Sequence, residues 1–319
     1  MLLEAIKMGH RDSLMNILQE SVGYVDFHPN CFWPPQPGIA ESPFVVVGVP
    51  FDETTTSRPG SRYGPNAIRA ASINFDTYSE RSDVDLDKIK IYDLGNVSIV
   101  QGSVQESLKR VKLVISDLIS ANKVPIILGG EHTITYAAAD AIKDALFLDF
   151  DAHMDARSEY PEGVPFTHAT VMRRISDLIG PERVFQVGVR TYCREETEFA
   201  RREGLGFITA YEIYKNGPST AIDRIVEKLR DFDKVYMSID IDVLDPPFAP
   251  GTTFPSPEGI SLSTLLDMLM KATDKRLVGF DVVEVAPPYD YGDITSTNAA
   301  KLILENVALI HKARSRAID

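Results

Sequence analysis

The stretch Asp151-Ala152-His153-Met154-Asp155 follows directly on the apolar run Ala145-Leu146-Phe147-Leu148-Asp149-Phe150. The run has the length of a buried strand, and the stretch after it places potential metal ligands at alternate positions. Alternate side chains of an extended chain point to the same side, so we expect Asp151, His153 and Asp155 to converge on one point. The sequence therefore predicts a strand that ends in part of a metal site.

Strands and helices alternate from residue 44 to the end of the chain. Helical segments are marked by apolar residues three and four positions apart, most clearly over 104–119. The runs that read as strands are short and apolar, and lie at 44–49, 89–94, 124–128, 146–150, 184–189, 206–208, 235–239 and 277–283. This alternation predicts an α/β fold with a mostly parallel sheet and helices on both faces. We see no linker or change in composition, which favours one domain.

Ahead of this series, the spacing of apolar residues predicts a short amphipathic helix over residues 1–20. A Pro-rich arm follows at 29–43 and contains Trp33, the single tryptophan. We expect these segments (about 1–43) to belong to the same domain, with the arm packed on its own domain. Packing of the arm on a neighbouring subunit is the alternative.

The chain is acidic, with 46 Asp and Glu against 33 Lys and Arg and a net charge of -13. This balance argues against a nucleic-acid partner and would attract a small cation, although an ordinary acidic protein has the same charge. The two cysteines, Cys31 and Cys193, form no disulfide framework, so we expect a cytoplasmic protein. Residues 1–8 do not resemble a signal peptide, and no apolar run approaches about 20 residues, so we expect no membrane partner.

Acids and histidines follow four of the predicted strands. They lie in Gly129-Gly130-Glu131-His132, in Asp151–Asp155, in Asp240-Ile241-Asp242 and at Glu284. Ligands of open parallel sheets bind at the carboxyl ends of the strands, so we expect these four segments to meet at one edge. Carboxylates buried together are costly unless a metal compensates their charge.

The types of ligand indicate which metal would bind. The candidates are two imidazoles and four carboxylates: His132, Asp151, His153, Asp155, Asp240 and Asp242. They are too many for one tetrahedral zinc and suit two hard cations, with manganese ahead of zinc because no cysteine takes part. Two such ions can share a water molecule and lower its pKa, which favours a catalytic site over a purely structural one.

Three motifs also resemble those of a known family. Gly129–His132, Asp151–Asp155 and Ser238-Ile239-Asp240-Ile241-Asp242-Val243-Leu244-Asp245-Pro246 are similar, in order and spacing, to the signature motifs of the ureohydrolases, the arginase and agmatinase family. The resemblance runs from about residue 44 to 311. It implies a three-layer α/β/α fold with a central eight-stranded, mostly parallel sheet. It also implies two Mn2+ ions per subunit and a homo-oligomer, either a trimer or a hexamer.

The resemblance also assigns roles to the ligands. One manganese ion would be held by His132, Asp151, Asp155 and Asp240. The other would be held by Asp151, His153, Asp240 and Asp242. Asp151 and Asp240 would bridge the ions, and Asp155 would also accept a hydrogen bond from a bridging hydroxide. That hydroxide would attack a guanidinium carbon, with release of urea and an amine.

Two further residues complete the catalytic set that the resemblance implies. His168 falls at the position of a loop histidine that passes a proton to the leaving amine, although its residue type alone fits a cap or surface histidine equally well. Glu284 falls where a carboxylate faces the guanidinium, whose planar N–H donors pair with both carboxylate oxygens. Asp149, Asp245 and Asp281 lie near ligands in the sequence and would either orient them or cap backbone turns.

The loop after the first motif indicates the substrate. Residues 156–165 lack the Asn-containing pattern of arginases and resemble the agmatinase version, as do Val187-Gly188-Val189-Arg190 and the acidic helix at 194–200. Acids near the mouth of the site would suit a small cationic guanidine with a second cation at its far end. The resemblance therefore implies hydrolysis of agmatine to putrescine and urea, a step of polyamine biosynthesis.

Three positions depart from the family pattern and leave alternatives open. Glu131 stands where Asp is commoner, Thr253 replaces Gly, and Phe254 replaces Thr. Loss of a glycine restricts the backbone, and a phenyl ring near the mouth would narrow or reshape the pocket. Arginine or another guanidino compound, such as a guanidino acid, is therefore an alternative substrate. A non-catalytic metal-binding or assembly protein is disfavoured, because all the expected ligands, His168 and Glu284 are present.

Overall fold

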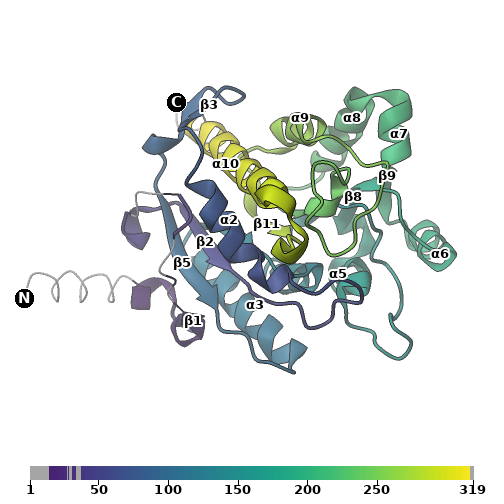
Figure 1. Ribbon diagram of the computed structural model, residues 1–319, viewed down its shortest axis with the longest axis horizontal. Helices are drawn as coiled ribbons and strands as arrows, with labels where there is room; N and C mark the ends of the chain where they lie inside the picture. The colour runs from purple at the N-terminus through teal and green to yellow at the C-terminus, as the bar shows by residue number, and fades with distance from the viewer. Residues whose placement is uncertain (1–13, 27, 29–30, 34–36, 317–319) are drawn as a thin grey trace, which may run out of the picture.

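A nine-stranded sheet runs through the centre of the molecule (Figure 1). The computed structural model describes residues 14–26, 28, 31–33 and 37–316. In spatial order the strands are β1 (Val25–Asp26), β5 (Ile91–Val97), β2 (Phe44–Gly48), β6 (Val124–Leu128), β11 (Leu277–Val283), β10 (Val235–Asp240), β7 (Leu146–Phe150), β8 (Val184–Val189) and β9 (Gly206–Thr209). Neighbouring strands pair in parallel except β1, which pairs antiparallel with β5.

The prediction of eight strands was wrong by one strand. The predicted strands are all present, and β1 adds a ninth at the edge of the sheet, where Val25 pairs with Val97 and Asp26 pairs with Asn96. Two residues are too few to show an alternating or continuous apolar pattern. This is why the sequence did not reveal the edge strand.

Helices cover both faces of the sheet, which confirms the predicted three layers (Figure 1). One face carries α2 (Gly64–Ser72), α7 (Ala210–Asn216), α8 (Pro218–Leu229), α9 (Leu262–Ala272) and α10 (Ile294–Ser315). The other carries α3 (Val104–Ser120), α4 (Thr135–Ala141), α5 (Val171–Ile179) and α6 (Arg194–Glu203). The strands between these layers are buried on both faces, as their continuous apolar runs predict.

A short helix and a two-stranded hairpin were not predicted either. Helix α7 has only 7 residues and begins at a capping box in which the side chains of Thr209 and Glu212 bond to each other's backbone amides. Strands β3 (Tyr78–Ser79) and β4 (Val84–Asp85) form a small antiparallel hairpin outside the main sheet. Such short segments contain too little of a period to be recognised in a sequence. Within the described residues, no helix is both long and apolar enough to cross a bilayer.

The predicted N-terminal helix and arm lie only partly within the described residues. Residues 14–17 are helical, whereas 1–13, and 29–30 and 34–36 of the arm, lie outside them. Phe32 and Trp33 are buried, and their amides donate hydrogen bonds to Asp93 Oδ2 (2.6 Å) and Ser72 Oγ (3.1 Å). This part of the arm packs on the body of the same chain, as we expected.

The strand order places the four polar segments side by side. Strands β6, β11, β10 and β7 are consecutive in the middle of the sheet, although they span residues 124 to 283 of the chain. Because they are parallel, their carboxyl ends lie at one edge. Residues that follow these four strands therefore share one location.

Arg69 of α2 and Asp93 of β5 form a buried ion pair, which generates a prediction about stability. Arg69 Nε lies 2.7 Å from Asp93 Oδ2, and the side chains are 0% and 3% exposed. We expect Arg69→Met to lower the free energy of unfolding by about 3–5 kcal/mol, because a buried carboxylate loses its cation. The control is Arg202→Met, which removes an exposed pair with Glu203 and should cost less than about 1 kcal/mol. Urea unfolding measures both losses, and equal losses would contradict the prediction.

Candidate metal centre

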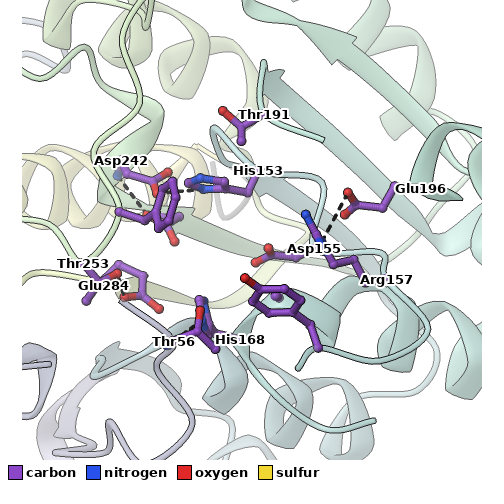
Figure 2. Close-up of a pocket in the computed structure, with 14 residues that line it drawn as sticks. Thr56, His153, Asp155, Arg157, His168, Thr191, Glu196, Asp242, Thr253 and Glu284 are labelled. Carbon is purple, nitrogen blue, oxygen red and sulfur yellow. Dashed lines mark hydrogen bonds and ion pairs between the residues drawn. The ribbon is translucent and has the colours of Figure 1, made fainter. Parts of the chain in front are cut away.

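Six candidate ligands from three segments meet at the carboxyl edge of the central strands. Strand β6 leads to one histidine, β7 leads into the alternating motif, and β10 ends in an aspartate with another in the next turn. These ligands are His132, Asp151, His153, Asp155, Asp240 and Asp242. All of them are buried except His153, which is partly exposed. In Figure 2, His153, Asp155, Asp242 and Glu284 surround one central space.

One group of ligands gathers around Nδ1 of His132. This atom lies 3.1 Å from Asp151 Oδ2, 3.3 Å from Asp155 Oδ2 and 3.5 Å from Asp240 Oδ2. Ligand atoms of His132, Asp151 and Asp155 all lie within 4.8 Å of one another. These atoms are close enough together to hold one metal ion.

A second group lies beside the first. Nδ1 of His153 lies 2.9 Å from Asp242 Oδ2 and 3.6 Å from Asp151 Oδ1. Asp151 therefore belongs to both groups, as a ligand that bridges two ions would. Asp240 contacts a member of each group, because its Oδ2 lies 3.5 Å from His132 Nδ1 and its Oδ1 accepts a hydrogen bond from the amide of Asp242 (2.9 Å). Its bridging role stays a prediction.

The nitrogen and oxygen atoms of these candidate ligands suit hard metal cations. His132 Nδ1, Asp151 Oδ2 and His153 Nε2 are buried and make no contact of hydrogen-bond geometry with the described residues. Burial, reinforced by the charge of Asp151, raises the pKa of Asp155 to about 7. Burial, with the charges of Asp242 and Asp151, raises the pKa of Asp240 well above its usual range. Crowded acids of this kind are relieved by bound cations.

Hydrogen bonds behind the ligands orient His132. Its Nε2 lies 3.1 Å from Ser238 Oγ, which in turn donates to Asp281 Oδ1 at 2.6 Å. The same nitrogen lies 3.5 Å from Asp149 Oδ1. Asp281 therefore orients His132 through Ser238, and Asp149 lies close to the same nitrogen without a hydrogen bond to it. Asp245 accepts a hydrogen bond from the amide of Gly259 (2.8 Å), as a backbone cap does.

The backbone brings His132 and Glu284 together. Gly130 O accepts the amide of Glu284 (2.8 Å), and the amide of His132 donates to Glu284 Oε1 (2.7 Å). A Cβ atom on Gly130 would lie 1.8 Å from Phe51 O, so the close approach of Phe51 to residue 130 requires glycine there. Glu284 (φ 64°) and Asp155 (φ 46°) adopt left-handed backbone conformations. Such conformations cost about 1–3 kcal/mol each and cluster at functional sites.

Glu284 lines the cavity with Thr253 next to it (Figure 2). The hydroxyl of Thr253 donates to Glu284 Oε2, and the amide of His132 donates to Oε1. Each carboxylate oxygen keeps a second lone pair, so Glu284 can still accept two N–H groups from a planar donor. Burial raises the pKa of Glu284 to about 8. At neutral pH a cation nearby is therefore needed to keep the carboxyl ionised.

His168 lines the same cavity and is held by the loop after β2. Its Nε2 accepts a hydrogen bond from the amide of Thr56 (3.2 Å) and lies 2.9 Å from Thr56 Oγ1, and its own amide donates to Thr54 Oγ1 (3.2 Å). Burial, reinforced by the charges of His153 and His132, lowers the pKa of His168 to about 4. The ring is therefore neutral at pH 7, and the hydrogen bond to Nε2 assigns its proton to Nδ1.

The cavity has a volume of about 100 Å³, and aromatic residues frame its mouth. The ring of Phe254 meets that of His153 edge-on, with 5.2 Å between their centroids, and Phe254 is 46% exposed. Arg157 lies over the ring of Tyr160, 4.5 Å from its centroid. Phe254 therefore lines the cavity beside a candidate metal ligand, and its effect on the width of the mouth stays a prediction.

The acids of α6 hold the loop that follows Asp155. Glu196 accepts a hydrogen bond from the amide of Ala156 (3.0 Å), and Glu195 accepts one from the amide of Ser158 (2.9 Å). Arg157 Nε lies 3.8 Å from Glu196 Oε2. Arg157 and Glu196 both line the cavity (Figure 2). A second cation on a substrate at this side of the cavity would therefore lie near the positive charge of Arg157 as well as the negative charge of Glu196.

Sequence reasoning did not identify three polar residues of this site. Thr54 and Thr56 hold His168, and Ser238 holds His132. Thr54 and Thr56 follow the carboxyl end of β2, so the rule that located the ligands also points to them. Ser238 lies inside a recognised motif, but its sequence context gave no sign of what it contacts.

Comparisons with known proteins agree with this geometry. Residues 42–308 match the Arginase family. The chain is 39% identical over 275 residues to an agmatinase of Bacillus cereus, an alignment that covers 84% of this chain and 92% of the relative. It is 36% identical over 272 residues to the N(1)-aminopropylagmatine ureohydrolase of Thermococcus kodakarensis, with 84% and 91% covered. The crystal structure of the agmatine ureohydrolase of Thermoplasma volcanium matches with a TM-score of 0.84 at 35% identity, over 91% of this chain and 97% of that one. The chain therefore belongs to the arginase family and is a ureohydrolase.

Proposed function

We propose that this ureohydrolase uses two manganese ions to hydrolyse agmatine to putrescine and urea. The observation that carries the proposal is the pair of ligand groups that share Asp151. Ligands from both groups line the same cavity as Glu284 and His168, which supports a reaction site over a structural ion site.

The donor set supports manganese because it is rich in oxygen and contains no thiolate. One ion would be held by His132, Asp151, Asp155 and Asp240. The other would be held by Asp151, His153, Asp240 and Asp242. When bound, the two ions would lower the pKa of a water molecule and so supply the nucleophile.

Glu284 would bind and orient the guanidinium group. Its two oxygens each hold one donor from the protein and keep one lone pair for the substrate. A guanidinium ion presents two parallel N–H groups that match these lone pairs. Thr253 and His132 fix the plane of the carboxylate and therefore the plane of the bound guanidinium.

Asp155 would interact with a proton of the attacking water, and His168 would transfer a proton to the leaving nitrogen. The oxygen of water adds to the guanidinium carbon, and the bond from that carbon to the alkyl nitrogen breaks as the nitrogen takes a proton. Asp155 would accept a hydrogen bond from the attacking water. Because its ring is neutral at pH 7, His168 would act as a relay that takes up a proton and passes it to the leaving nitrogen.

Agmatine is favoured by the relatives and by the apolar ring of Phe254 in the lining of the cavity. Two of the compared proteins are named for agmatine hydrolysis, and an unbranched alkyl chain suits the opening beside Phe254. The second candidate is a guanidino acid, because the cationic Arg157 lines the cavity and would pair with a carboxylate.

Location and assembly also belong to this proposal. A cytoplasmic location is supported by Cys31 and Cys193, which are both free thiols among the described residues. A homo-oligomer, either a trimer or a hexamer, rests on the family resemblance. A small cationic guanidine as partner is supported by the net charge of -13.

The direct test is urea release from a panel of guanidines by the full chain, with and without added Mn2+. The panel holds agmatine, N(1)-aminopropylagmatine, arginine and 4-guanidinobutyrate. We expect manganese-dependent urea release with the highest kcat/KM for agmatine. A preference for 4-guanidinobutyrate would replace agmatine with the guanidino acid. If no member of the panel yields urea, the proposed chemistry is wrong.

Replacement of Asp242 tests the second ligand group. Asp242 is the carboxylate nearest to His153, so we expect Asp242→Ala to lower kcat/KM by more than about 100-fold, beyond the loss typical of a residue that acts behind a ligand. Asp144→Ala, which removes an exposed pair with Lys234, is the control and should leave urea release unchanged. Normal activity in Asp242→Ala would refute the assignment of this ligand.

The pKa of Glu284 predicts how substrate affinity depends on pH. Its folded-state pKa is raised to about 8, so in metal-free protein the carboxyl is protonated below that pH and ionised above it. Agmatine affinity of the metal-free protein should therefore rise between pH 6 and 8, by up to about 10-fold per pH unit. Calorimetric titration measures this, and Glu284→Gln should remove the rise. A flat profile in the unmodified protein would show that Glu284 does not hold the guanidinium.

A further inference from the structure

Arg190 follows the last residue of β8, and its side chain bonds to two other loops, at residues 242–244 and 256–257. Its guanidinium donates hydrogen bonds to main-chain oxygens, the shortest to Asp242 O (2.6 Å). The other acceptors are the carbonyl oxygens of Gly188 (3.3 Å), Val243 (3.2 Å), Leu244 (3.2 Å), Ser256 (2.9 Å) and Pro257 (3.0 Å). One side chain therefore fixes the turn that carries Asp242 and the loop that follows Phe254.

The backbone of Arg190 contacts the other half of the ligand set. Its amide donates to Ala152 O (2.8 Å), and the amide of Thr191 donates to the same oxygen (2.9 Å). Ala152 stands between Asp151 and His153 in the chain. Arg190 thus touches the backbone on both sides of the ligand group formed by Asp151, His153 and Asp242.

An arginine suits this position for two reasons. Five N–H groups in a rigid plane can serve carbonyls from several loops at once, which the three donors of a lysine cannot do. Its charge also lies near the acid cluster. Burial lowers the pKa of Arg190, and the carboxylates of Asp242 and Asp151 oppose that shift.

We propose that Arg190 is a positioning residue that sets the geometry of the Asp151, His153 and Asp242 ligand group, and thereby the affinity of the second manganese ion. The inference rests on the proposed two-metal function. Arg190 is not among the described residues that line the cavity, and it acts through the main-chain oxygen of Asp242.

The experiment compares Mn2+ binding by the full-length protein and its variants. Arg190→Lys keeps the charge and loses most of the donors, and Arg190→Met loses both. Arg276→Lys is the matched control, because Arg276 also donates to main-chain oxygens, those of Leu229 and Phe232, but at the amino end of β11. Calorimetry and electron paramagnetic resonance count the bound ions, and urea unfolding of metal-free protein reports stability separately.

We expect the unmodified protein and Arg276→Lys to bind two ions each. Both Arg190 variants should bind one ion normally and the second about 10–100-fold more weakly. Urea release by Arg190→Lys should recover as Mn2+ is raised, which a purely structural role would not produce.

Two results would overturn the inference. The first is normal affinity for both ions in the Arg190 variants, with only the unfolding midpoint lowered. The second is an equal loss of the second ion in Arg276→Lys, which would indicate general destabilisation. If the unmodified protein itself failed to bind two ions, the two-metal function would be wrong, and this inference with it.

Discussion

Buried negative charge at the carboxyl ends of β6, β7 and β10 is the constraint on which the site depends. Asp151, Asp155, Asp240 and Asp242 lie together out of water, where each uncompensated charge costs several kcal/mol. The raised pKa values of Asp155 and Asp240 reflect the cost of ionising carboxyl groups that are buried beside other carboxylates. Bound cations would compensate the charge of this cluster, which could hold a metal ion, and would stabilise the folded state.

The apolar core fixes the positions of these acids. Strands β6, β11, β10 and β7 are buried between two helical layers, so neither face of a strand can move to solvent. A shift of one residue in register would turn Asp151 and His153 away from their partners. The geometry of the ligands is thus a consequence of how Leu148 and Phe150 pack in β7, three residues and one residue before Asp151.

The sequence predicted those parts of the structure that have a local pattern. Continuous apolar runs located the parallel strands, and the rule for their carboxyl ends located the six ligands and Glu284. His168 was assigned only by the family resemblance, because its residue type alone also fits a cap or surface histidine. Thr56 and Arg190 could not be assigned a role in this way. Their functions arise from contacts with segments about 50 to 110 residues away, and such contacts leave no period or spacing in the chain.

Two departures from the family pattern, Glu131 and Thr253, lie next to the side chains proposed to bind substrate or transfer protons. Glu131 accepts hydrogen bonds from the amide and the hydroxyl of Thr54, and the same hydroxyl accepts the amide of His168. Thr253 donates to Glu284 in the same way. Both departures therefore lie in hydrogen bonds to Glu284 or, through Thr54, to His168, the two side chains proposed to act on substrate, and not at a candidate metal ligand. If His168 and Glu284 act as proposed, these supporting hydrogen bonds would set where a guanidinium group and a proton carrier lie relative to candidate ligands that the core holds in place.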